Sequence, residues 1–189
     1  MKEVAVYCAS ASDLAESYRQ EARDLGVGLA ASGLALVYGG GNVGLMGEIA
    51  RSVHERGGYV AGYIPERLMA IEGRAYDVAD ELIVTQTMQE RKRSIFGRAD
   101  AFVVLAGGLG TLEEFLEVAT LRKLGYHDKP IILINTGGFY NRLLDFFAHT
   151  ETEGFSPSLE GLYAVVPDAA RAVELLQSAL FQADSPVSP

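Results

Sequence analysis

Two neighbouring acidic residues at the start of an expected helix give the first indication of chemistry. An apolar run passes through a glycine-rich turn into a segment of helical period in the sequence Leu105-Ala106-Gly107-Gly108-Leu109-Gly110-Thr111-Leu112-Glu113-Glu114. The free N–H groups at such a helix start favour an anion, and the Thr111 hydroxyl can bind a phosphate oxygen. Glu114 shares a helix face with Val118 and Leu121, so we expect apolar surroundings for it. The spacing Thr111-x-x-Glu114 equally describes a capping box, in which the carboxylate only satisfies a backbone N–H.

A second segment supplies a cation. It reads Thr87-Met88-Gln89-Glu90-Arg91-Lys92-Arg93-Ser94-Ile95, and Met88, Ile95 and Ala99 form the stripe expected to be buried. Arg91 lies at the edge of that stripe, where a guanidinium requires a carboxylate or phosphate partner. The alternative is a solvated basic face made of Arg91, Lys92 and Arg93. Burial of the Arg91 guanidinium distinguishes the two.

A third segment is a glycine-rich turn of the sequence Tyr38-Gly39-Gly40-Gly41-Asn42-Val43-Gly44-Leu45-Met46-Gly47. Glycines let the backbone approach a ligand, and Gly40 and Gly41 are our candidates for such an approach. The turn also matches the dinucleotide fingerprint G-x-G-x-x-G, but the acidic residue expected at the end of the next strand is missing. A tight turn that needs glycine for packing is the other explanation.

Alternating strands and helices are needed to position these segments, and the sequence contains them. Short apolar runs, typical of parallel strands covered on both faces, alternate with amphipathic segments. The runs are Val4–Cys8, Leu34–Tyr38, Tyr59–Ile64, Leu82–Thr85, Ala101–Leu105, Ile131–Ile134 and Tyr163–Val166. The amphipathic segments are Leu14–Ala31 after Ser12 as N-cap, Val43–Arg56, Met88–Arg98 after Thr87, Thr111–Leu124, Tyr140–Thr150 and Ala169–Leu180.

This alternation predicts an α/β fold, a doubly wound Rossmann-like parallel sheet with helices on both faces. We expect a single nucleotide-binding catalytic domain over residues 1–182 and a disordered tail over 183–189. Ligands bind beyond the carboxyl ends of the strands in such sheets, which directs attention to the loops after Cys8, Tyr38, Ile64 and Leu105.

The composition narrows the class of function. The chain has 189 residues, 49% of them apolar, and a formal net charge of −9. A nucleic-acid partner is not expected, because polyphosphate binding needs a basic face. The single cysteine, Cys8, fits a reducing compartment, and no apolar run is long enough to span a membrane, so we expect a cytoplasmic protein. The three histidines show no ligand spacing, and we expect neither a metal nor a cofactor.

Taken together, the three segments resemble the LOG family of cytokinin riboside 5′-monophosphate phosphoribohydrolases, formerly mislabelled lysine decarboxylases. The family patterns GGG-x-x-GLMG, M-x-x-RK and PGG-x-GT-x-x-E match residues 39–47, 88–92 and 107–114. Further matches are Leu124-Gly125-Tyr126-His127-Asp128-Lys129-Pro130 and Asn135-Thr136-Gly137-Gly138-Phe139-Tyr140. Two positions depart from the pattern: Ala106 replaces the family proline, and Ala9 replaces a glycine before Ser10.

The resemblance implies hydrolysis of the N-glycosidic bond of an N6-modified adenosine 5′-monophosphate, giving free base and ribose 5-phosphate. Arg91 and Glu114 would be the catalytic pair, and a homodimer would contribute to the active site. The residues expected to bind the substrate are Lys92, Gly108, Leu109, Gly110, Thr111, Glu113, Thr120, Gly40, Gly41 and Met88. A family glutamate near the ligand would correspond to Glu72, although the spacing of Glu72 to Arg91 differs by one residue from the family pattern.

Cleavage of a ribosyl C–N bond develops oxocarbenium character, which a carboxylate such as Glu114 can stabilise while it orients water. The guanidinium of Arg91 scarcely deprotonates, so it is a poor general acid. A non-catalytic nucleotide-binding module and an NAD(P)-dependent oxidoreductase are the alternatives. Pyridoxal-dependent decarboxylation ranks lowest, because none of the four lysines, Lys2, Lys92, Lys123 and Lys129, has a recognisable Schiff-base setting.

Overall fold

A parallel sheet organises the whole chain. The computed structural model describes residues 1–72 and 75–181, and over these ranges seven strands form one sheet in the order β4-β3-β2-β1-β5-β6-β7. All neighbouring strands are parallel. The strands are β1 (Glu3–Tyr7), β2 (Ala35–Tyr38), β3 (Val60–Pro65), β4 (Glu81–Thr85), β5 (Ala101–Val104), β6 (Ile131–Ile134) and β7 (Ala164–Val166). The predicted parallel sheet is confirmed.

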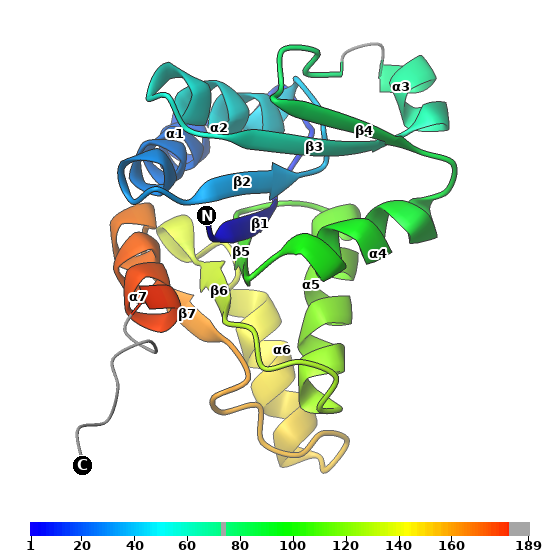
Figure 1. Ribbon diagram of the computed structural model, residues 1–189. Coiled ribbons are helices and arrows are strands. Elements are labelled where there is room, and N and C mark those ends of the chain that lie inside the picture. Colours follow the sequence, from blue (N-terminus) through cyan, green and yellow to red (C-terminus); the bar gives the residue numbers. More distant parts are fainter. Residues whose placement is uncertain (73–74, 182–189) are drawn as a thin grey trace, which may run out of the picture.

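Helices cover both faces of this sheet, as Figure 1 shows. One face carries α1 (Glu16–Ala31), α2 (Gly44–Glu55) and α7 (Ala169–Phe181). The other face carries α4 (Met88–Arg98), α5 (Leu109–Lys123) and α6 (Asn141–Thr152). The short helices are α3 (Glu66–Glu72) and the 3-10 helix η1 (Thr136–Gly138). The fold is the predicted doubly wound α/β arrangement.

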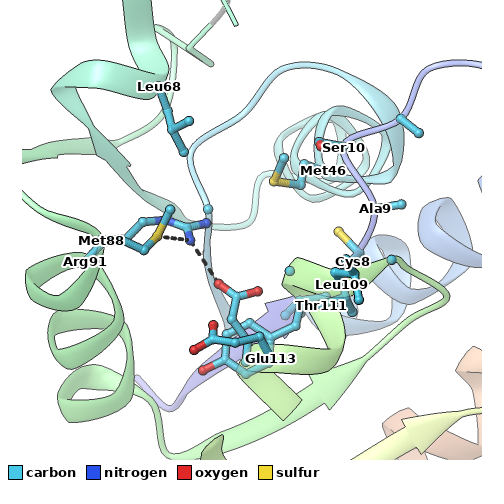
Figure 2. Close-up of a pocket in the computed structure, with 17 residues that line it drawn as sticks. Cys8, Ala9, Ser10, Met46, Leu68, Met88, Arg91, Leu109, Thr111 and Glu113 are labelled. Atoms are coloured by element: carbon cyan, nitrogen blue, oxygen red, sulfur yellow. Dashed lines mark hydrogen bonds and ion pairs between the residues drawn. The ribbon is translucent and has the colours of Figure 1, made fainter. Parts of the chain in front are cut away.

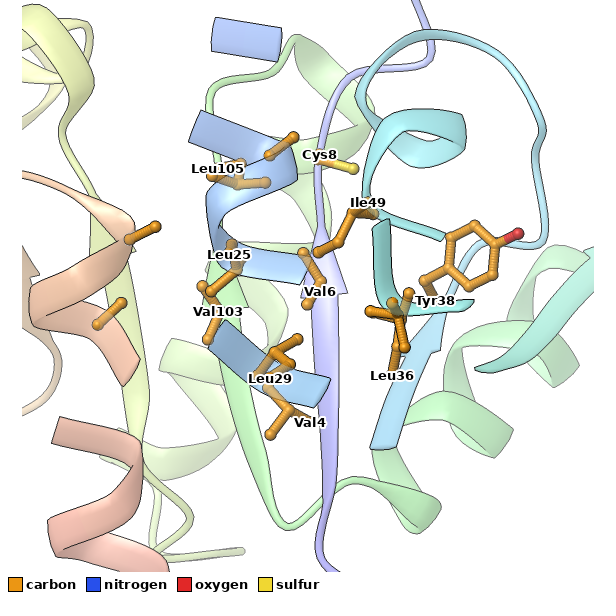
Figure 3. Close-up of a cluster of buried hydrophobic side chains, with 14 of the residues drawn as sticks. Val4, Val6, Cys8, Leu25, Leu29, Leu36, Tyr38, Ile49, Val103 and Leu105 are labelled. Carbon is orange, nitrogen blue, oxygen red and sulfur yellow. The ribbon is translucent and has the colours of Figure 1, made fainter. Parts of the chain in front are cut away.

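Alternation along each strand divides the core into two layers. Val4, Val6 and Cys8 of the β1 segment pack with Leu25 and Leu29 of α1 on one face (Figure 3). Ala5 and Tyr7 belong to the layer under α4, α5 and α6 on the other face. This division follows from the two-residue period of a strand, and both layers are apolar because both faces of the sheet are covered.

Helix α4 begins as predicted. Thr87 is its N-cap, and its hydroxyl accepts a hydrogen bond from the Glu90 N–H at 3.1 Å. Glu90 in turn accepts from the Gln86 N–H at 2.9 Å. These bonds satisfy backbone donors at the start of the helix, and they fix the first turn of α4, on which Met88 and Arg91 lie.

Two other helix starts differ from the sequence predictions. Ser12 does not cap α1, which begins at Glu16 after Ala15 with no side-chain cap. Helix α5 begins at Leu109 instead of Thr111, and Gly108 is its N-cap. Thr111 therefore lies inside the first turn, so Thr111 and Glu114 do not form a capping box.

Helix α3 was absent from the predicted elements, and it follows directly on β3. The predicted tail, 183–189, lies outside the described residues, and so does the Glu72 side chain. Within the described part of the chain, none of the helices combines the length and the apolar character needed to cross a membrane.

Candidate active site

A cavity of about 400 Å³ opens at the carboxyl ends of the central strands. The loop after β1, the glycine turn after β2, the start of α3, the start of α4 and the first turns of α5 form its walls (Figure 2). The cavity therefore lies where the strand-end rule predicted a ligand site. Its lining residues include Cys8, Ser10, Gly39, Met46, Leu68, Met88, Arg91, Gly108, Leu109, Gly110, Thr111, Glu113 and Glu114.

An ion pair lies at the wall of this cavity. Arg91 Nη1 of α4 donates to Glu114 Oε1 of α5 at 2.9 Å, and the two side chains are only 11% and 12% exposed. Figure 2 shows this contact as a dashed line beside the opening. The interpretation of Arg91 as part of a solvated face is therefore wrong, and the guanidinium has the carboxylate partner that its burial requires.

The Glu114 carboxyl has an unusual electrostatic environment. Burial raises its pKa above the ordinary value, and the nearby Arg91 guanidinium opposes that rise. Glu113, the neighbouring acid, raises the pKa further. A carboxylate held by one guanidinium in a largely desolvated wall is a strong local negative charge, suited to stabilising a developing cation.

Arg91 is fixed from a second side by the sheet. Its Nε donates to the carbonyl of Tyr63 in β3 at 2.9 Å. A Cβ atom added to Gly39 would collide with Arg91 Nη2, so this glycine leaves the space that the guanidinium occupies. One function of the first glycine-rich turn is therefore to let Arg91 pass beneath the backbone.

The second glycine-rich turn presents the N-terminus of a 15-residue helix to the cavity. Gly108, Leu109 and Gly110 are exposed, whereas the Thr111 side chain is buried and packs against Gly107. A Cβ atom on Gly107 would collide with Thr111 Oγ1, so this contact requires glycine. The unpaired N–H groups of the first helical turn make this wall suitable for an anion.

The residues next to Arg91 and Glu114 also form an ion pair between α4 and α5. Lys92 forms ion pairs with Glu113 and, at 3.2 Å, with Glu117. Its side chain is 17% exposed, and Arg93 beside it is exposed. The solvated-face interpretation therefore holds for Arg93 alone. Lys92 reaches the cavity wall through Glu113, and it is not itself among the lining residues.

Four other residues from the sequence predictions lie differently from expectation. Met88 is 38% exposed and overhangs the cavity, so its place in the buried stripe of α4 was wrong, while Ile95 and Ala99 are buried. Gly40 and Gly41 are not among the residues that line the cavity, although Gly39 is. Thr120 is exposed and lies about 13 Å beyond Thr111 along α5, at 1.5 Å per residue.

Sequence reasoning named the right loops but missed several lining residues. Cys8, Ser10 and Leu68 follow strands whose ends had been singled out, yet their types alone carried no chemical signal. Tyr7 also lines the cavity, and burial raises the pKa of its phenol well above the usual range, with Glu114 adding to the rise. Burial likewise raises the pKa of the Cys8 thiol, which leaves it an uncharged part of the wall.

The cavity thus combines an anion-binding helix start with a desolvated carboxylate and a fixed guanidinium. Met46 and Leu68 add apolar wall, and Met88 lies against Arg91, whose Nη1 donates to the Met88 sulfur at 3.4 Å (Figure 2). In the described ranges, no cluster of three or more histidine, cysteine, aspartate or glutamate side chains could hold a metal ion. Such a site can bind a phosphorylated, partly apolar molecule and stabilise positive charge next to Glu114.

Comparisons with known proteins agree with this chemistry. A family model described as "Possible lysine decarboxylase" matches residues 46–176. The chain is 43% identical to the cytokinin riboside 5′-monophosphate phosphoribohydrolase LOG5 of Arabidopsis thaliana, over 94% of this chain and 78% of that protein. It is 44% identical to the probable cytokinin riboside 5′-monophosphate phosphoribohydrolase LOGL9 of Oryza sativa subsp. japonica, over 93% and 78%.

A solved structure extends the comparison to the fold. The molybdenum cofactor binding protein of Rippkaea orientalis matches with a TM-score of 0.72 at 22% identity, covering 94% of this chain and 97% of that one. At this identity the match describes the fold alone. The same doubly wound sheet therefore occurs in a protein that is named for binding a different ligand, the molybdenum cofactor.

Proposed function

The chain belongs to the LOG family of cytokinin riboside 5′-monophosphate phosphoribohydrolases, and from this premise we propose that it hydrolyses the N-glycosidic bond of N6-modified adenosine 5′-monophosphates. The products are the free base and ribose 5-phosphate. The observation that carries the proposal is the buried Arg91–Glu114 pair, which shares one cavity with the open N-terminus of α5.

Glu114 is the residue that acts on the sugar. Breaking the bond between the base and the anomeric carbon builds positive charge on the ribose, and a nearby carboxylate stabilises that charge. The same carboxylate orients the attacking water or takes its proton. Arg91 keeps Glu114 ionised and holds its orientation, because one guanidinium contacts both the carboxylate and the Tyr63 carbonyl.

The start of α5 binds the 5′-phosphate. Leu109, Gly110 and Thr111 line the cavity, and the free N–H groups of this first helical turn are the proposed phosphate donors. Binding energy from this remote group positions the anomeric carbon against Glu114, which is how a non-reacting part of a substrate contributes to rate. Met46, Leu68 and Met88 supply the apolar surface for the base and its N6 substituent.

A homodimer completes this proposal. Leu116 and Thr120 of α5 and its C-cap Leu124 lie at helical spacing and are all exposed. This stripe forms the contact between two copies, and Thr120, distant from the cavity of its own chain, reaches the site of the partner. The apolar character of the stripe supports the interface, because exposed leucines aligned on one helix face are typical of association surfaces.

The description of the family model as a lysine decarboxylase does not fit this cavity. Pyridoxal phosphate needs a lysine for its Schiff base, and none of the residues that line the cavity in the described part of the chain is a lysine. Lys92 is the lysine that directly follows a lining residue, Arg91. The hydrogen bond to Glu113 raises the pKa of Lys92, which keeps its amine protonated. A protonated amine is no nucleophile.

The remaining expectations concern partners and compartment. We propose a cytoplasmic protein without a nucleic-acid partner. A single buried thiol, Cys8, suits a reducing compartment, and a net charge of −9 disfavours binding to polyphosphate chains.

The decisive experiment is a panel of nucleoside 5′-monophosphates with and without an N6 substituent, each paired with its unphosphorylated nucleoside. Released base and ribose 5-phosphate are separated and quantified by chromatography. We expect base from N6-alkylated adenylates and little from any nucleoside. Tight binding without released base would identify a binding module instead, and equal turnover of nucleotide and nucleoside would contradict the phosphate anchor.

A further inference from the structure

The turn that presents α5 to the cavity is supported from outside by Tyr140. This residue lies between η1 and α6, and it is 2% exposed. Its hydroxyl donates to the carbonyl of Leu105 at 2.8 Å. Burial raises the pKa of this phenol, and the nearby backbone N–H of Gly107 opposes that rise. The phenol therefore contacts the short segment that leads into the helix start, through its hydrogen bond at Leu105.

The position of this phenol is set independently of the turn. The Tyr140 N–H donates to Asn135 Oδ1 at 2.7 Å, and the Tyr140 carbonyl accepts from the Leu144 N–H at 2.9 Å as α6 begins. Asn135 directly follows β6 and also donates to Asn141 Oδ1 at 2.7 Å. The neighbouring Phe139 ring contacts the Tyr140 ring edge-on, with centroids 4.8 Å apart. Strand β6 and helix α6 thus hold the hydroxyl in place.

The turn itself has little intrinsic stiffness. Ala106 occupies the position of the family proline, so the backbone before the glycines has no fixed φ. Gly107 and Gly108 follow, and glycine is the most permissive residue for backbone conformation. The Ala106 carbonyl accepts from the Ala9 N–H at 3.2 Å, which fixes one point on the side of β1. The hydroxyl of Tyr140 supplies a fixed point on the opposite side, at the Leu105 carbonyl.

We propose that Tyr140 is a positioning residue for phosphate binding, whose hydroxyl holds the Leu105–Gly108 turn so that the N–H groups of α5 point into the cavity. It acts through the turn, because Tyr140 is not among the residues that line the cavity. The inference rests on the proposed function for the phosphate group of the ligand. It does not require that the bound molecule be cleaved.

The test is Tyr140→Phe, which removes the hydroxyl and keeps the ring. Ribose 5-phosphate is titrated calorimetrically as a phosphorylated probe that undergoes no hydrolysis. We expect its affinity to fall by about threefold to tenfold, the scale of one net hydrogen bond. KM for an N6-alkylated adenylate rises by a similar factor, while the affinity for the unphosphorylated nucleoside, measured by the same calorimetry, stays unchanged. A loss of packing alone would lower the affinities for nucleotide and nucleoside together.

Two further variants make the result specific. Tyr59→Phe is the matched control. Tyr59 lies just before β3, and its hydroxyl donates to Glu81 of β4 instead of to the turn. It should bind ribose 5-phosphate as the wild type does. Adding Ala106→Pro to Tyr140→Phe should recover affinity, since proline restores stiffness to the turn by another route.

Three outcomes would overturn the inference. The first is wild-type affinity for ribose 5-phosphate in Tyr140→Phe, and the second is an equal fall for nucleotide and nucleoside. The third is a double variant that melts at the wild-type temperature and recovers none of the lost affinity. A wild-type protein that binds ribose 5-phosphate but releases no base from any nucleotide would remove the proposed function and leave this inference standing.

Discussion

Glu113 and Glu114 are adjacent in the chain, yet each pairs with a different cation of α4. Glu113 contacts Lys92 and its side chain is 55% exposed, whereas Glu114 contacts Arg91 and is 12% exposed. Two carboxylates of identical chemistry therefore differ in desolvation and in partner. Burial raises the pKa of Glu114, and its partner guanidinium is also fixed to the sheet by the Tyr63 carbonyl.

Glu114→Gln should lower kcat by at least about 100-fold, the scale of a lost acid–base or electrostatic group. Glu117→Gln, the same change one turn along α5, should leave kcat near the wild-type value, because an ion pair of this exposure contributes little. Steady-state assays on both variants, with melting curves to establish folding, decide the matter. Wild-type turnover in folded Glu114→Gln would remove this residue from the mechanism.

The acid side of the pH–rate profile should report the Glu114 carboxyl. The ionised form is required, and burial raises its pKa, so activity is lost at a higher pH than an ordinary glutamate would give. Arg91 lowers this pKa, so Arg91→Gln should move the loss of activity further upward in pH. Glu113 raises it, so Glu113→Gln should move the loss downward. Profiles of kcat/KM that shift in the same direction in both variants would contradict this assignment.

Gly39→Ala should impair catalysis through Arg91. The added methyl would occupy the place of Arg91 Nη2, and the guanidinium would have to leave the Tyr63 carbonyl or Glu114. We expect kcat to fall by about tenfold or more, since misplaced catalytic groups lose rate steeply. Gly97→Ala is the control, because a Cβ there meets nothing within 4 Å. It should stabilise α4 by about 0.5–1 kcal/mol in thermal unfolding without loss of activity.

If α5 forms the dimer interface, a charge introduced on its exposed face should separate the two copies. Leu116→Glu should give a monomer in sedimentation velocity and lose activity, because a buried carboxylate without a partner disfavours the interface. Val78→Glu, at a site that is 65% exposed and outside α5, should remain dimeric and active. A wild-type protein that is fully active as a monomer at assay concentration would disprove the contribution of Thr120 to a partner's site.

Much of the fold was predictable because buried parallel strands leave a clear pattern. The run Ala101–Leu105 was predicted as a strand and β5 spans Ala101–Val104, since continuous apolar residues are needed where helices cover both faces. Helix α4 was bounded correctly because Thr87 caps it by local chemistry. The start of α5 was missed because Gly108, Leu109 and Gly110 do not signal a helix, and glycine at an N-cap resembles glycine in a loop.

Contacts between side chains that are distant in sequence could not be predicted from local patterns. The sequence indicated that Arg91 needs an anionic partner, but the choice of Glu114 depends on how α4 and α5 pack on the sheet. Met88 was assigned to the core by its apolar type, whereas its place on the first turn of α4 puts it on the cavity wall. The support that Tyr140 gives to Leu105 joins two strand ends that are neighbours only in the folded sheet.

The strand order has a consequence for protein engineering. The first half of the chain forms strands β1 to β4, and the second half forms β5, β6 and β7. Arg91 precedes Asp100, the residue just before β5, and Glu114 follows it, so the ion pair joins the two halves. A backbone cut there would put the guanidinium and its carboxylate on separate fragments. Base released by the mixed fragments would then measure reassociation of the two halves directly, which makes the enzyme a label-free sensor of fragment complementation.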